Sequence, residues 1–290
     1  MKLNDCYNFK DFRKLAKKKL PDPIFHYIDG GADDEVTLNR NTEAFNDCDL
    51  VPSILNSVGE PNLSTTVFGT NINMPLFLSP TAMQSLYHPD GDKASARAAE
   101  KFGTIYSMST MASFSIEEIS SISNGPKIFQ LYIHKDQSIT DDLIDRCKQN
   151  NFNGMCITVD TIVAGNRERD HRTGFTTPPK FTLESIMSFV MRPKWVFNYF
   201  TNKKFELANL KDKTDKGTNI AKSVMEYINE QYDPAMNWKD AEYVVKKWNG
   251  PIALKGVMSI EDAKKAIDIG CTAIMISNHG GRQLDGSRSP

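Results

Sequence analysis

The sequence predicts an α/β chain that folds as a (β/α)8 TIM barrel, preceded by a helical N-terminal segment. From Met74 onward, short apolar runs alternate with helical patterns, which is typical of a parallel sheet buried on both faces. The glycine signature of a dinucleotide-binding sheet is absent after the first run, which favours a barrel over an open sheet. The runs expected to form strands are 74–79, 104–109, 127–133, 154–160, 251–256 and 272–277.

Candidate site residues stand at the end of each expected strand. They are Pro80, Thr81 and Ala82 with their backbone, then Ser109, Gln130, Tyr132, Thr158, Asp160, Lys255, Ser277 and His279. The catalytic residues of a TIM barrel lie at the carboxyl ends of its strands. The alternative is that polar loops simply follow strands, but this explains poorly why Tyr132 and Lys255 stand inside apolar runs.

The number of expected strands bears on domain organisation. A closed barrel of this type has eight strands, and we count about six. We therefore expect residues 1–290 to form one domain that is incomplete at its C-terminal end. Residues 1–73 are expected to form an N-terminal extension, in which Phe9, Phe12, Leu15 and Ala16 recur at helical spacing. Residues 175–240 form an insertion between the fourth and fifth expected strands.

The composition excludes several classes of protein. Thirty-five basic and 36 acidic residues give a net charge of −1, and 40% of residues are hydrophobic. This excludes a disordered charged tail and an electrostatic binder of nucleic acid. No secretory signal or membrane-spanning run is expected. Five scattered cysteines and five histidines lack metal-ligand spacing, so we expect reduced thiols in the cytoplasm and no metal site.

The sharpest motif is Ser-Asn-His-Gly-Gly-Arg-Gln at 277–283. His279 follows a buried run directly, so its imidazole can project into a pocket and accept a proton near neutral pH. Arg282 offers a planar pair of donors to a carboxylate. Asp160 can orient an imidazole and stabilise its protonated form, or it can act as a helix N-cap. These two readings of Asp160 stay open on the residues alone.

Charged and aromatic residues elsewhere add candidates for anion binding. Arg167 can hold a substrate carboxylate, whereas Glu168, Arg169 and Asp170 are expected in a solvated loop with surface ion pairs. Tyr27 and Tyr132 each combine an apolar ring with a hydroxyl donor. Lys255, at the end of an apolar run, can stabilise negative charge on an electron-accepting ring.

These residues together resemble the FMN-dependent L-2-hydroxy-acid dehydrogenases and oxidases. The segment SNHGGRQLDG is similar to the active-site signature of this family. LPDPIFHYIDGGADDE, SPTAM, FQLY, ITVDT, GNRERD, NWKD and LKGV occur in the family's order, so the resemblance covers about residues 7–290. The strongest resemblance is to bacterial L-lactate dehydrogenases.

The resemblance implies a role for each candidate residue. It implies that His279 is the base, oriented by Asp160, and that Tyr27, Arg167 and Arg282 bind the substrate carboxylate. Tyr132 is expected near the substrate oxygen as a catalytic and binding group. The cofactor is expected to be FMN, and its contacts are Pro80, Thr81, Ala82, Ser109, Gln130, Thr158, Lys255 and Ser277.

The implied activity is oxidation of an L-2-hydroxy acid, first of all L-lactate, to the 2-oxo acid. His279 takes the hydroxyl proton if hydride moves to FMN, or the Cα proton if a carbanion forms, and the sequence does not separate these routes. The alternatives are an oxidase of glycolate or another 2-hydroxy acid that uses oxygen, and a non-catalytic truncated remnant. The electron acceptor can be a quinone, a cytochrome or oxygen.

The resemblance also bears on partners and location. The family's phosphate site lies in the last two strands, which are not found here, so we expect weak FMN binding by residues 1–290. Aromatic and basic residues mix at 180–205, which suits peripheral contact with the inner face of the cytoplasmic membrane. The alternative for this segment is a lid on the active site. We expect a homo-oligomer for the full-length protein.

Overall fold

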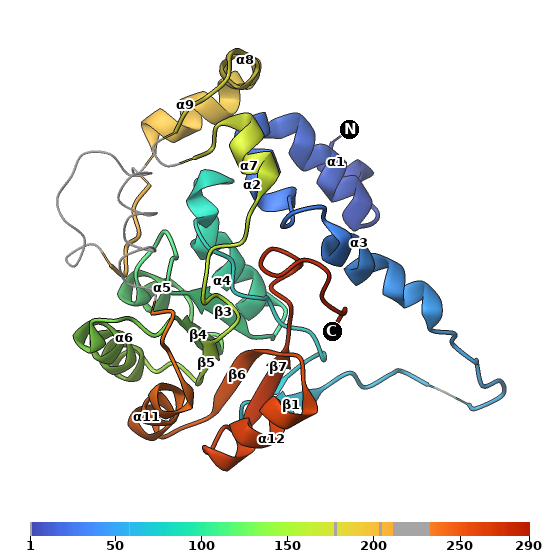
Figure 1. The fold of residues 1–290 in the computed structure, drawn as a ribbon. Coiled ribbons are helices and arrows are strands. Elements are labelled where there is room, and N and C mark those ends of the chain that lie inside the picture. Colours follow the sequence, from blue (N-terminus) through green and yellow to red (C-terminus); the bar gives the residue numbers. More distant parts are fainter. Residues whose placement is uncertain (1, 58, 177–178, 203–204, 211–232) are drawn as a thin grey trace.

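The computed structural model describes all residues except 1, 58, 177–178, 203–204 and 211–232, and its centre is a parallel sheet. The five strands lie in chain order, with β3 at one edge and β7 at the other (Figure 1). Their bounds are β3 (Tyr106–Ser109), β4 (Lys127–Leu131), β5 (Gly154–Thr158), β6 (Ile252–Val257) and β7 (Ala273–Ile276). All residues of β3, β4 and β5 are buried. The alternation in the sequence therefore predicted the sheet type correctly.

Helices between the strands cover one face of this sheet. They are α4 (Gly91–Lys101), α5 (Ile116–Ile122), α6 (Gln137–Gln149), α11 (Trp238–Trp248) and α12 (Ile260–Asp268). Side chains cap several of them: Ser115 accepts a hydrogen bond from the Glu118 amide, and Ser259 accepts one from the Asp262 amide. These caps satisfy amides that the first helical turn leaves free. The strand–helix boundaries thus follow from local sequence.

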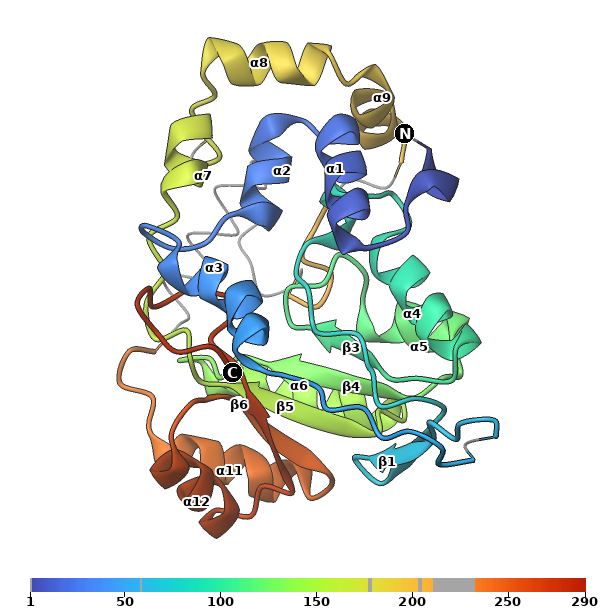
Figure 2. The ribbon, with the colours of Figure 1, turned by 90° about the vertical axis from the view of Figure 1, so that its right-hand side faces the viewer.

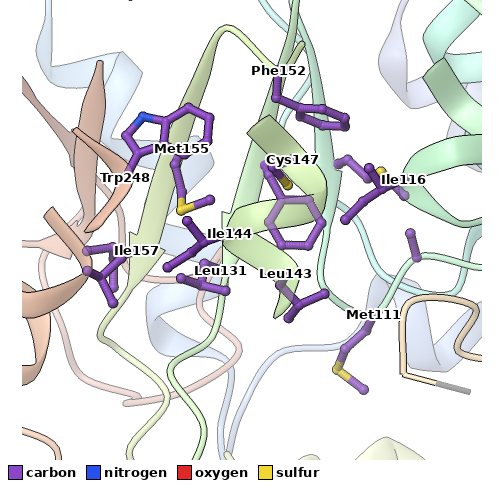
Figure 3. Close-up of a cluster of buried hydrophobic side chains, with 14 of the residues drawn as sticks. Met111, Ile116, Leu131, Leu143, Ile144, Cys147, Phe152, Met155, Ile157 and Trp248 are labelled. Carbon is purple, nitrogen blue, oxygen red and sulfur yellow. The ribbon is translucent and has the colours of Figure 1, made fainter. Parts of the chain in front are cut away.

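The main core lies between the sheet and these helices (Figure 3). Leu131 and Met155 of the sheet meet Leu143 and Ile144 of α6, and all four side chains are fully buried. Each such side chain contributes roughly 1.5–3 kcal/mol when it leaves water. This core fixes the sheet that carries the polar strand ends on its other face.

A β-hairpin closes the sheet at the amino ends of its strands. Its strands are β1 (Thr65–Val67) and β2 (Thr70–Ile72), which pair antiparallel. Ile72 packs with Ile105 and Ile128, near the starts of β3 and β4. The hairpin was not expected from the sequence, where 1–73 showed only a helical pattern. It leaves the carboxyl ends of the strands as the open end of the sheet.

The expectation of six strands is wrong by one. Residues 74–79 do not form a strand but make a single parallel bridge, in which Leu78 pairs with Tyr106. Pro75 has no amide hydrogen, and the Leu76 amide bonds back to the Met74 carbonyl. The run is apolar enough for a strand but cannot supply a regular ladder of donors.

Short helices of the N-terminal segment pack over the open end of the sheet (Figure 2). They are η1 (Leu3–Asp5), α1 (Phe9–Lys19), α2 (Asp22–Asp29), α3 (Val36–Glu43), η2 (Ala44–Asp47) and, further on, η3 (Gln84–Leu86). Helix α1 is present as predicted, but its expected apolar face is not buried as a whole. Leu15 is buried, whereas Phe9 is 90% exposed and Phe12 46% exposed. The part of α1 from Arg13 onward contacts the protein, since Arg13 pairs with Asp29 and Leu15 is buried.

The chain between β5 and β6 adds three further described helices at the same end. They are α7 (Glu168–Thr173), α8 (Leu183–Val190) and α9 (Pro193–Thr201). Helix α8 buries its serines, since the hydroxyl of Ser188 accepts from the Asp22 amide and that of Ser185 donates to the Thr173 carbonyl. Its apolar side chains Leu183 and Val190 face outward. Among the residues that the structure describes, no helix is long and apolar enough to cross a bilayer.

A buried carboxylate gives the fold a testable pH dependence. Asp92 is fully buried in α4, where its oxygens accept hydrogen bonds from the Tyr106 hydroxyl at 2.9 Å and the Ser113 amide at 3.0 Å. Burial raises the pKa of Asp92 to about 6, although both hydrogen bonds oppose the shift. Because the folded state holds this proton more tightly than the unfolded chain, the stabilising contribution is lost as pH rises from about 4 to 6.

We therefore expect the destabilisation caused by Asp92→Asn to shrink as pH rises from 4 to 7. The change should be about 2 kcal/mol in the free energy of unfolding, because the unfolded carboxyl is already partly ionised at pH 4 and not all of the roughly two-unit pKa shift is released in this range. Urea unfolding at several pH values measures it, and Asp90→Asn, at an exposed neighbouring position, is the control. A cost for Asp92→Asn that stays constant or grows over this range would contradict the assignment.

Candidate active site

A cavity of about 450 Å³ opens at the carboxyl ends of the strands. All the predicted site residues except Asp160 line it: Tyr27, Pro80, Thr81, Ala82, Ser109, Gln130, Tyr132, Thr158, Arg167, Lys255, Ser277, His279 and Arg282. They come from the N-terminal segment, the loop before η3, strands β3 to β6 and the loops after β5 and β7. The structure therefore brings into one space side chains that lie up to 255 positions apart in the sequence.

His279 and Asp160 form a hydrogen-bonded pair at one wall of the cavity. His279 Nδ1 lies 2.8 Å from Asp160 Oδ1, and the His279 amide donates to the Ser277 hydroxyl. His279 has φ +60°, a conformation that few side chains adopt. A carboxylate at Nδ1 favours the tautomer with its hydrogen there, which leaves Nε2 as a proton acceptor. The pair has the arrangement of a general base and its orienting acid.

Asp160 occupies a space that Gly256 leaves open. A Cβ added at Gly256, which has φ +104°, would lie 2.7 Å from Asp160 Cβ. The ladder between β6 and β7 shifts register here, between Lys255 and Val257. Lys255 Nζ lies 3.8 Å from the second oxygen, Asp160 Oδ2. The irregular end of β6 thus leaves room for the Asp160 carboxylate and also carries Lys255, whose positive charge partly balances that carboxylate.

Two arginines and a tyrosine form another part of the wall. The guanidinium carbons of Arg167 and Arg282 lie 5.1 and 5.3 Å from the centre of the Tyr27 ring, within the range of cation–π attraction. Arg282 also donates to the Gly30 carbonyl at 2.6 Å, and Arg167 forms an ion pair with Asp170 at 2.9 Å. The two cations are held in place by these contacts, with further donors available to an anion.

The expectation that Glu168, Arg169 and Asp170 lie in a solvated loop is wrong for two of the three. These residues begin helix α7, and Asp170 is only 7% exposed. Burial raises the pKa of Asp170, while Arg167 and Arg282 favour its charged form. Arg169 bridges Asp29 and Glu35 of the N-terminal segment. The residues pair because α2 packs against α7, a contact that local sequence does not reveal.

The ends of β3, β4 and β5 form a polar row. The Ser109 hydroxyl donates to Gln130 Oε1 at 3.1 Å, and Gln130 Nε2 donates to the Thr158 hydroxyl at 2.8 Å. All three side chains are buried. The hydrogen bonds fix the orientation of the Gln130 amide, so the row presents defined donors and acceptors to the cavity.

Sequence reasoning missed three residues of this site. Tyr87 lines the cavity and donates to the Ala82 carbonyl, and Gln283 lines it while accepting from the Gly165 amide. Asp170 pairs with Arg167. Gln283 lies within the motif at 277–283 and Asp170 three residues after Arg167, so helical spacing was an available signal for Asp170. No local signal marks Tyr87.

Comparisons with known proteins agree with this geometry. Residues 16–290 match the FMN-dependent dehydrogenase family. The chain belongs to this family. It is 38% identical over 277 residues to an L-lactate dehydrogenase of Allorhizobium ampelinum, covering 95% of this chain and 73% of that protein. It is 36% identical to glycolate oxidase 1 of Oryza sativa subsp. indica, with coverages of 98% and 71%.

A solved structure extends the likeness to the fold. The chain superposes on a monotopic membrane protein, (S)-mandelate dehydrogenase, with a TM-score of 0.93 and 30% identity, covering 99% of this chain and 76% of that one. The parallel sheet and its helices are thus part of a TIM-barrel flavoenzyme fold. The family oxidises 2-hydroxy acids with FMN, which confirms the predicted cofactor and reaction class.

The donor set of the cavity fits a flavin. An isoalloxazine ring is flat and carries hydrogen-bonding groups along one edge, and the row Ser109, Gln130 and Thr158 supplies matching buried groups. Lys255 is largely buried, with 12% of its side chain exposed, and its nearest carboxylate oxygen is 3.8 Å away. Such a cation can stabilise an anionic ring.

The contact between Gly256 and Asp160 gives a test of the site's geometry. We expect Gly256→Ala to push Asp160 away and to lower kcat for a 2-hydroxy acid by about 10–100-fold, since small misplacements of catalytic groups cost that much. Steady-state kinetics measure the effect. Gly69→Ala is the matched control, because Gly69 has φ +68° but nothing within 4 Å of an added Cβ. Equal losses in both variants would show that backbone strain alone is responsible.

Proposed function

We propose that this chain oxidises L-lactate to the corresponding 2-oxo acid with FMN as the cofactor. The observation that carries the proposal is the His279–Asp160 pair, at 2.8 Å, which shares one cavity with Arg167 and Arg282. This arrangement provides a proton acceptor and two carboxylate-binding cations. The 38% identity to an L-lactate dehydrogenase supports lactate among the 2-hydroxy acids.

In this proposal His279 accepts a proton from the substrate. Its Nδ1 is committed to Asp160, so Nε2 is the atom that takes the proton. Asp160 keeps the ring in one orientation and stabilises the imidazolium that results. A positioned base of this kind contributes typically 10²–10⁴-fold to the rate.

Arg167 and Arg282 bind the substrate carboxylate, and both guanidinium groups lie against the ring of Tyr27. Two fixed cations orient the acid so that its reacting carbon faces the base. Tyr132 lines the same cavity and is proposed to hydrogen-bond the substrate oxygen. In this proposal the substrate carboxylate binds to side chains that other contacts of the protein already hold in place.

The cofactor is held by the polar row together with Pro80, Thr81, Ala82, Lys255 and Ser277. FMN supplies the electron-accepting ring for this reaction. Lys255 stabilises negative charge beside the row. Its Nζ lies 3.8 Å from Asp160 Oδ2, so the same positive charge acts on the cofactor site and on the carboxylate that orients the base.

We also propose that helices α8 and α9 contact a membrane surface peripherally. Helix α8 buries Ser185 and Ser188 and exposes Leu183 and Val190, so its apolar side faces away from the protein. Phe197 and Phe200 of α9 are 66% and 79% exposed. Lys180, Arg192 and Lys194 flank this surface. Apolar groups bordered by cations suit a membrane interface, and the mandelate dehydrogenase to which the chain is similar is a monotopic membrane protein.

The catalytic proposal predicts that L-lactate bleaches the flavin absorbance of the FMN-loaded protein faster than glycolate or (S)-mandelate. We expect His279→Gln to lower the bleaching rate by about 10²–10⁴-fold, while Arg282→Lys mainly raises the lactate concentration needed for half-maximal rate. Anaerobic stopped-flow absorbance measures both. Reoxidation by oxygen, a soluble quinone or cytochrome c then identifies the acceptor class. Faster bleaching by another acid would reject lactate, and full activity of His279→Gln would reject the base.

The membrane proposal predicts that Met187→Glu with Val190→Glu abolishes flotation with phospholipid vesicles, because two charges then replace apolar groups that enter the interface. Ile260→Glu with Ile267→Glu is the matched control, since these side chains of α12 are 72% and 67% exposed and lie at the opposite end of the molecule (Figure 1). Equal flotation of both double variants would contradict the assigned surface.

A further inference from the structure

A second cavity, of about 350 Å³, lies outside the catalytic one. It is enclosed by the end of α1, by η3 with the loop that follows it, and by α9. In both ribbon views α1 and α9 lie at the same end of the molecule as α8 (Figures 1 and 2). Tyr87 lines both cavities, so this space borders the catalytic site.

The charged side chains around this second cavity are cationic. Lys18, Lys19, Arg192 and Lys194 line it, and no aspartate or glutamate is among the described residues of its wall. A cluster of positive charges without carboxylates repels itself and attracts an anion. The single sign of its charged residues distinguishes the cavity from an ordinary mixed surface.

Arg192 has few hydrogen-bond partners within the protein. Its Nε is buried and has no hydrogen-bond partner, and its terminal nitrogens reach only the Met191 and Lys17 carbonyls at 3.4 Å. Arg192 is also the N-cap of α9, where no side chain caps the helix. The positive end of the helix dipole adds to the guanidinium charge. Both charges would attract a phosphate.

The cavity also borders the apolar surface of α8 and α9. Trp195 and Tyr199 line it with stacked rings, 5.2 Å between centres, and Trp195 Nε1 donates to the Leu86 carbonyl at 2.8 Å. Met191, 64% exposed, belongs both to the wall and to the apolar surface. Tryptophan and tyrosine are typical of the level at which lipid headgroups lie.

We propose that this cavity binds the phosphate group of an anionic phospholipid headgroup. The proposal rests on the membrane contact of α8 and α9 and extends it, because it assigns a class of lipid and a binding site for its headgroup. Arg192, Lys18 and Lys19 bind the phosphate oxygens, Lys194 balances the remaining charge, and the acyl chains continue over the exposed side chains of α8 and α9. A free phosphate offers the same oxygens but no chains to cover this apolar surface.

The test compares two double variants of one helix that change the net charge equally. Lys18→Glu with Lys19→Glu alters the cavity, whereas Lys10→Glu with Lys14→Glu alters α1 outside it. Vesicles of phosphatidylcholine, with and without phosphatidylglycerol, are mixed with each protein and floated. We expect the wild type to prefer vesicles with phosphatidylglycerol. The cavity variant should lose at least about tenfold in partition coefficient on them, and the control less than about threefold.

Each other outcome has a definite meaning. Equal losses in the two variants would show that vesicle binding depends on the overall charge of the protein, and would reject a headgroup site in the cavity. Binding of the wild type without preference for phosphatidylglycerol would keep the membrane contact and overturn the headgroup site, whereas no binding to any vesicle would overturn both. Calorimetric binding of glycerol phosphate without vesicle binding would assign the cavity to a soluble anion instead. If the cavity variant fails to fold by circular dichroism, Lys19→Gln replaces it, with Lys14→Gln as control and the same direction expected.

Discussion

The hydrogen bond between Asp160 and His279 depends on how three neighbouring strands end. Asp160 follows β5 and His279 follows β7, while β6 lies between them. The two side chains meet only because the end of β6 lacks a side chain at Gly256 and shifts its register there. A regular β6 would fill the gap with a Cβ. The same irregular end brings Lys255 to 3.8 Å from Asp160, so one local departure from ladder geometry positions the base, its acid and a cation.

The N-terminal segment supplies the other constraint. The Ala32 amide donates to the Gly281 carbonyl, and the side-chain amides of Asn41 and Asn278 bond to each other in both directions. Asp285 accepts from the first amides of α3. The loop that carries His279 and Arg282 is thus held from outside the sheet. Tyr27, which stacks on both arginines, belongs to the same segment, so residues 1–73 form part of the site.

The fold class and most of the candidate site could be predicted from the sequence because both follow from short-range patterns. Buried parallel strands leave apolar runs, and their carboxyl ends meet at one edge, so residues such as Gln130 and Thr158 had to converge. The sequence could not predict that residues 74–79 form a single bridge at Leu78 instead of a strand. This depends on which groups the Leu76 amide and carbonyl bond to. Nor could it predict the burial of Asp170, because the contact of α2 with α7 joins segments about 140 positions apart. Tyr87 belongs to the site only through the packing of η3.

The outward apolar side of α8 also follows from long-range contacts. The Asp22 amide, at the start of α2, bonds to the Ser188 hydroxyl, and the Thr173 carbonyl, at the end of α7, accepts from Ser185. Both are backbone groups at helix ends that need partners, so the serines turn inward and Leu183, Met187 and Val190 turn outward. Phe175, just after α7, packs on Tyr27 with ring centres 5.0 Å apart. One layer of side chains therefore joins the proposed membrane surface to the proposed carboxylate site, and the cavity that shares Tyr87 lies in that layer.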